Sequence, residues 1–62
     1  MDTDEIIALL REEGEGNRGV FYEAYGSNIR PLLIPLADLL DNAQGEHPEA
    51  VSEVIRVFNS IV

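Results

Sequence analysis

The sequence contains no cysteine and no lysine, and its 62 residues include one histidine. Without cysteine, neither a disulfide nor a thiolate metal site can stabilise so short a chain. Without lysine, 4 arginines carry all the positive side-chain charge, against 12 acidic residues and a net charge of -8. Because phosphate contacts need clustered Lys or Arg, this balance excludes direct nucleic-acid binding through a basic patch and disfavours anionic membranes.

Long apolar runs are also missing. No run approaches the roughly 18 residues of a membrane-spanning helix, and the N-terminal residues 1–5 are acidic, unlike a signal peptide. We therefore expect a cytoplasmic protein. The length predicts one small helical domain over residues 1–62, near the lower limit for a chain that folds alone. We expect oligomerisation to complete its core.

The most apolar stretch, residues 29–43, predicts the central helix of that core. Its apolar side chains step by three, four, three and four, the spacing that keeps them on one helix face. Leu33 and Leu40 widen this face, while Asp38 and Asp41 fall on the opposite, solvated face. The predicted buried face consists of Ile29, Leu32, Leu36, Leu39 and Ala43.

Two prolines set the expected start of this central helix. Proline inside a helix costs about 3 kcal/mol, because it lacks an N–H and clashes with the preceding turn. We therefore predict a start at residue 32 or 33, which places Pro35 in the first turn, after a connector over residues 27–31. Gly45 is expected to cap the C-terminal end.

Two further amphipathic helices are predicted near the ends of the chain. Asp2 or Thr3 is expected to cap the first helix and Gly14 to end it, with an apolar stripe over residues 6–10. The last helix is expected to begin at Pro48, and its apolar residues recur at steps of three and four. Because its connection to the central helix is short, the two should form an antiparallel hairpin.

Residues 20–25 are compatible with either helix or strand. Phe21, Ala24 and Tyr25 suit one face of a short helix capped by Asn17, but the same segment has high strand propensity. Helix is favoured because a hairpin here would lack a third strand. The sequence thus predicts an all-α protein of three or four short helices.

The string from Gly14 to Ala24, GEGNRGVFYEA, matches the pattern G-x-G-x-x-G. It resembles the glycine-rich loop of protein kinases, which covers the phosphates of ATP. The kinase loop is followed by a strand with a phosphate-pairing lysine, and this chain has no lysine. A Rossmann site would need a strand before the loop. We interpret the string as a flexible connecting loop and expect no cofactor.

Asp38, Asp41, Glu46 and His47 are residue types that bind metals, and they lie close together in the sequence. We interpret them as a solvated helix face followed by a polar turn. No Ser/His/Asp or Cys/His arrangement is evident either. The sequence therefore predicts a non-enzymatic protein without a metal.

Our leading hypothesis is a protein-interaction module that self-assembles through apolar helix faces, most simply as a homodimer. Such a dimer would share one apolar core between two copies. The residues predicted at its interface are Leu33, Leu36, Leu40, Ile55, Phe58, Ile61 and Val62.

One alternative is a small acidic inhibitor or adaptor, of the kind that mobile elements encode. Its negative surface would occupy a basic site on a partner protein. The predicted contacts are Glu12, Glu13 and Glu15.

A second alternative is an oligomer that binds a small anionic ligand. Arg18 and Arg30 supply rare positive charge beside Tyr22, and tyrosine is enriched in binding interfaces. Tyr25 is a further predicted contact, although packing alone would also explain an aromatic residue at helical spacing.

Overall fold

The computed structural model describes the backbone of residues 1–61 and the side chains of residues 1–60. In this part of the chain every regular element is helical, which confirms the predicted all-α class and the helix at residues 20–25. The elements are α1 (Thr3–Gly14), α2 (Val20–Tyr25), the 3₁₀ turn η1 (Ser27–Ile29), α3 (Arg30–Glu46) and α4 (Pro48–Ile61).

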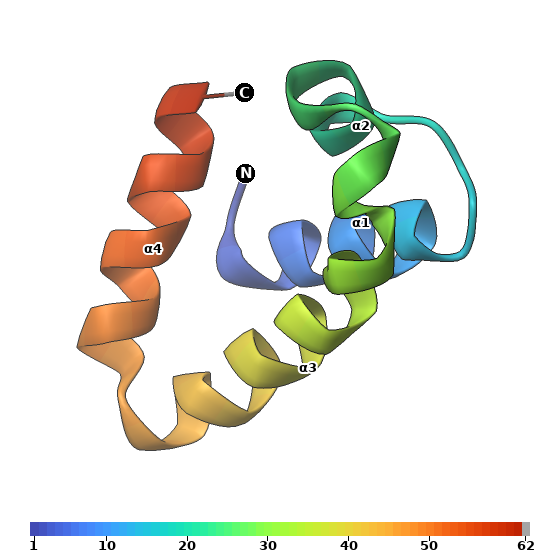
Figure 1. Cartoon of the computed structure of the whole chain (residues 1–62). Helices are drawn as coiled ribbons and strands as arrows, with labels where there is room; N and C mark the ends of the chain where they lie inside the picture. The colour runs from blue at the N-terminus through green and yellow to red at the C-terminus, as the bar shows by residue number, and fades with distance from the viewer. Residues whose placement is uncertain (62) are drawn as a thin grey trace.

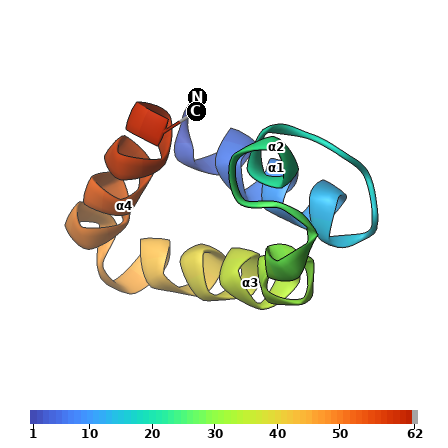
Figure 2. The same ribbon diagram turned by 45° about the horizontal axis from the view of Figure 1, so that its top comes forward.

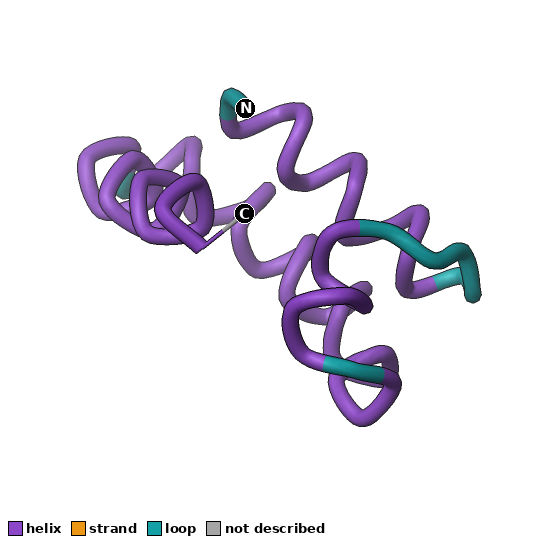
Figure 3. The backbone as a smooth tube through the Cα atoms, turned by 90° about the horizontal axis from the view of Figure 1, so that it is seen from above, coloured by secondary structure: helices purple, strands orange, loops and turns teal. Residues whose placement is uncertain are grey.

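Helices α3 and α4 are separated by His47 alone and pack against one another. They diverge from this residue, and α1 lies behind the pair and contacts both (Figures 1 and 3). The start of α1 lies beside the end of α4 (Figure 2). Two hydrogen bonds join them there: the Met1 amino group donates to Asn59 Oδ1 at 2.8 Å, and Asn59 Nδ2 donates to the Met1 carbonyl at 2.7 Å. Contacts with α1 thus close the space between α3 and α4 from one side.

One apolar core lies between α1, α3 and α4. The buried apolar residues are Ile6, Ile7, Leu10, Phe21, Leu33, Ala37, Leu40, Val51 and Ile55. Helix α2 contributes Phe21, whose ring packs edge-to-face on Phe58 with 5.5 Å between centroids. Because α1 provides three of these residues, its apolar stripe is a central part of the core.

The face that helix α3 turns to the core is rotated from the predicted one and overlaps it in part. Leu33, Ala37 and Leu40 are buried, whereas Leu32 and Leu39 are 63% and 65% exposed. Adjacent helical residues lie about 100° apart around the axis. Of the predicted buried face, Ile29, Leu36 and Ala43 do pack against the core and are partly buried, whereas the prediction was wrong for Leu32 and Leu39.

Arg11 of α1 helps to fix this orientation of α3. Its guanidinium donates to Asp38 Oδ1 at 2.6 Å and to Asp41 Oδ2 at 3.4 Å. The aspartate side of α3 therefore faces α1. Leu32 lies nine residues before Asp41, about half a turn around the axis, and so projects away from α1.

The predicted ends of α1 and the predicted start of α4 are confirmed. The Asp2 side chain accepts a hydrogen bond from the Glu5 amide at 2.9 Å, and α1 ends at Gly14. Helix α4 begins at Pro48. In each case a local capping preference agrees with the packing, so the helix boundary can be predicted from the sequence.

Both predicted ends of α3 were wrong. The helix begins at Arg30 directly after η1, so Pro31 occupies the first turn and Pro35 lies inside the helix. At the other end it continues through Gly45, and the His47 amide closes the last turn by donating to the Ala43 carbonyl at 2.6 Å. The first proline, rather than the second, therefore takes the position that needs no N–H donor.

The two neighbouring leucines of α3 give a direct test of its orientation. We expect Leu40→Ala to lower the free energy of unfolding by about 2–5 kcal/mol, because it leaves a cavity in the core. Leu39→Ala, the matched control, should change it by less than about 0.5 kcal/mol. Urea denaturation of dilute protein, followed by circular dichroism, measures both. Equal losses would contradict the observed orientation.

Candidate functional site

The side chain of Glu13 is buried although it lies at the end of an acidic helix. It is only 2% exposed. Its carboxylate accepts hydrogen bonds from the backbone amides of α2, with Oε1 at 2.8 Å from Tyr22 N and Oε2 at 3.2 Å from Phe21 N. One carboxylate therefore satisfies two of the amides that a helix start leaves without intrahelical partners.

Glu13 replaces the local cap that α2 lacks. The N-cap residue is Gly19, which has no side chain to accept a hydrogen bond. Asn17, the predicted cap, instead donates from Nδ2 to the Glu12 carbonyl at 3.2 Å. A helix of six residues is marginal by itself, so its attachment to α1 through Glu13 is important for its position.

The glycines of the G-x-G-x-x-G string have structural roles here. A Cβ atom on Gly19 would lie 2.6 Å from Glu13 Oε2, so the capping carboxylate needs a glycine at this position. Gly16 has a φ of +117°, which side chains disfavour. A Cβ atom on Gly14 would lie 2.6 Å from Ile34 Cγ1, where α1 approaches α3. Folding thus accounts for the spacing that resembles a kinase loop.

The structure brings Arg18, Tyr22 and Arg30 together, as the ligand-binding hypothesis requires. The Tyr22 ring centroid lies 4.8 Å from Arg18 Cζ and 5.2 Å from Arg30 Cζ, both within cation–π range. The loop, α2 and the start of α3 each supply one of these residues. The fourth predicted contact residue, Tyr25, is 43% exposed at the end of α2.

The residues predicted at the self-assembly interface are mostly unavailable to a second copy. Leu33, Leu40 and Ile55 are buried within one chain, and Leu36 and Phe58 are partly buried against the same core. The side chain of Ile61, and Val62, lie outside the described residues. The large apolar side chains that α3 and α4 do expose include Leu32, Leu39, Val54 and Val57.

The predicted acidic contact surface is interrupted. Glu12 and Glu15 are exposed, but Glu13 between them is buried under α2. A partner protein can therefore reach only two of the three glutamates without unfolding α2. Neutralising all three would report on folding as well as on binding.

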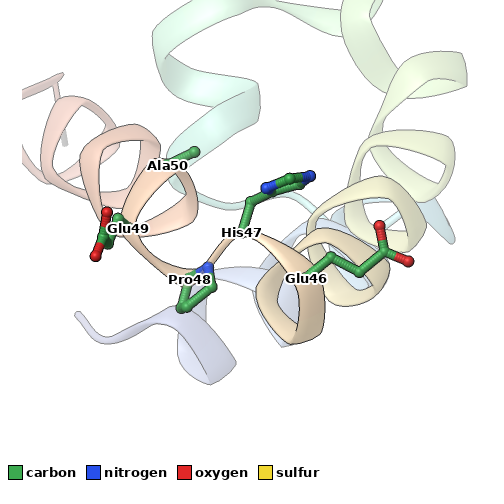
Figure 4. A pocket seen from close by; sticks show the side chains of 5 residues that line it. All are labelled: Glu46, His47, Pro48, Glu49 and Ala50. Carbon is green, nitrogen blue, oxygen red and sulfur yellow. The ribbon is translucent and has the colours of Figure 1, made fainter.

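The metal-type residues near the end of α3 do not converge. Asp38 and Asp41 pair with Arg11, and no group of three or more potential ligands is arranged around a metal position in the described part of the chain. A shallow hollow lies at the α3–α4 connection, where Glu46 and Glu49 point away from each other on either side of His47 (Figure 4). This hollow presents no converging set of ligands.

Comparison with known proteins adds no assignment: the sequence matches no family model, no curated protein and no solved structure. None of the helices in the described residues combines the length and apolarity needed to cross a bilayer.

The capping role of Glu13 can be measured directly. We expect Glu13→Ala to lower the free energy of unfolding by about 1–3 kcal/mol, because two amides lose their acceptor. The neighbouring exposed Glu12→Ala should change it by less than about 0.5 kcal/mol. Urea denaturation measures both, and similar values for the two variants would argue against the cap.

A double-mutant cycle tests the contact between Glu13 and Gly19. In the natural background Gly19→Ala should destabilise the protein, because its Cβ atom would lie 2.6 Å from Glu13 Oε2. In the Glu13→Ala background the same substitution should lose most of its cost, since the clashing atom is gone. Equal costs in both backgrounds would show that the two residues are not coupled.

Proposed function

We propose that this chain is a small, non-enzymatic interaction module of the cytoplasm that self-associates through an exposed apolar face of α3 and α4. We define the apolar face by Leu32 and Leu39 on α3 and Val54 and Val57 on α4. The exposure of the two leucines, 63% and 65%, is the observation that carries the proposal. Single exposed apolar residues are common on folded proteins, but Leu32 and Leu39 lie seven residues apart on the same side of α3, and clustered exposed apolar residues indicate an interaction surface.

Leu32 and Val57 lie on the sides of their helices that are turned away from α1. On α3, Leu32 lies half a turn around the helix from Asp41, which faces Arg11 of α1. On α4, Val57 lies about 160° around the axis from Asn59, which is bonded to Met1. Because α1 packs on the other side of both helices, it does not cover these residues.

Charges beside the apolar face are largely compensated, which favours a second copy as the occupant. Within residues 32–43 the charged side chains are Asp38 and Asp41, and both pair with Arg11. Within residues 50–57 they are Glu53 and Arg56, which pair with each other at 2.9 Å. Two identical faces can therefore meet without bringing the rest of the negative charge into the contact.

The total accessible surface favours association between folded copies. It measures 4042 Å², close to the roughly 4,000 Å² expected for a folded monomer of this mass. A transient interface of up to about 600 Å² per partner would cover roughly 15% of that surface. We therefore propose a reversible, concentration-dependent dimer rather than one whose chains fold only together.

Sedimentation analysis between about 1 µM and 1 mM, a range that suits a weak interface, tests this proposal. We expect the average mass to rise toward that of a dimer as concentration increases. Leu39→Glu should raise the dissociation constant at least tenfold, because pairing would bury the new charges without partners.

Val20→Glu is the matched control, since it adds the same charge at a 38% exposed residue of α2, outside the apolar face. It should leave the dissociation constant within about threefold, because an exposed charge away from the interface contributes little. A wild-type protein that stays monomeric throughout the range would refute self-association, and equal effects of the two variants would place the interface elsewhere.

A further inference from the structure

Two of the four arginines are not used in ion pairs in the described part of the chain. Arg11 pairs with α3 carboxylates, and Arg56 pairs with Glu53. Among the described residues, the side chains of Arg18 and Arg30 lie within 4.0 Å of no carboxylate oxygen and make no hydrogen bond. In a chain with 12 acidic residues, the lack of an acidic partner for two neighbouring arginines calls for a physical reason.

The Arg30 side chain lacks a hydrogen-bond acceptor among the described residues. Its side chain is partly buried at the first residue of α3, and its Nε atom is buried with no hydrogen-bond partner in the described residues. A buried donor without an acceptor is costly, and such groups are rare in folded proteins. After a small side-chain movement, the guanidinium of Arg30 can therefore donate a hydrogen bond to an acceptor from outside the chain.

The two guanidinium groups also repel each other. Because both lie beside one Tyr22 ring, their carbon atoms are separated by at most about 10 Å, roughly one Debye length at 0.1 M salt. Glu13 forms no ion pair with either arginine, and its carboxylate accepts hydrogen bonds from the amides of Phe21 and Tyr22. An anion bound beside the guanidinium groups would reduce this repulsion.

We infer that Arg18, Tyr22 and Arg30 form a binding site for the oxyanion group of a small ligand, a phosphate or a carboxylate. Guanidinium groups bind both by paired, charge-assisted N–H···O bonds. The tyrosine holds each guanidinium beside its ring through a cation–π contact and has a hydroxyl that can donate a further hydrogen bond. Arg30 shares α3 with Leu32 and Leu39 of the apolar face, but all three residues of the site come from one chain, so the site does not depend on self-association.

Nuclear magnetic resonance with inorganic phosphate and, separately, with acetate tests the site on the natural chain. Sodium chloride keeps the ionic strength constant. We expect saturable shifts of the Tyr22 amide and of the Arg18 and Arg30 Nε–H signals. Saturation by phosphate alone would identify a phosphate site, by acetate alone a carboxylate site, and by both a general oxyanion site.

Arg30→Gln should weaken the binding at least tenfold, and Arg56→Gln, the matched control at a paired arginine, should leave it unchanged. If Arg30→Gln fails to fold by circular dichroism, Arg18→Gln gives the same test, because Arg18 is exposed in the loop. Shifts that do not saturate, that chloride reproduces, or that persist unchanged in the arginine variants would overturn the inference.

Discussion

The burial of α1 against α3 and α4 is the constraint on which the rest of the structure depends. Ile6, Ile7 and Leu10 are three of the nine buried apolar residues in the core, and α1 contacts both later helices. Once α1 occupies one side of the α3–α4 pair, Arg11 can reach Asp38 and Asp41. The exposed pairs themselves contribute little stability, but they are consistent with only one orientation of α3.

The position of α1 also determines that of α2. Glu13 follows Leu10 by three residues on the same side of α1, so its side chain is directed toward the interior rather than to solvent. A buried carboxylate is costly unless its oxygens are hydrogen-bonded, and the amides of Phe21 and Tyr22 meet that need. The capping contact therefore stabilises both the glutamate and the short helix.

Sequence reasoning succeeds here where local chemistry and packing agree. The Asp2 cap, the start at Pro48 and the α4 stripe through Val51 and Ile55 follow from local signals. The buried face of α3 does not, because leucines cover more than one side of that helix and the position of α1 decides which side is buried. For the candidate site, the grouping of Arg18 with Tyr22 and Arg30 was predicted because positive charges are rare in this chain and these two lie close to Tyr22 in the sequence. The role of Glu13 was not, although its spacing from Leu10 places it on the buried side of α1 and so separates it from its acidic neighbours.

The distribution of charge separates two surfaces with different chemistry. Around the apolar face, acidic side chains are paired with Arg11 or Arg56, so the contact area carries little net charge. Around Tyr22 the opposite holds: two positive groups lie together without a carboxylate partner among the described residues. Self-association of an acidic chain is opposed by long-range repulsion, and an anion at the second surface would make each copy more negative. Ligand binding would therefore weaken association at low salt and have less effect as the ionic strength rises, even if the two surfaces never touch.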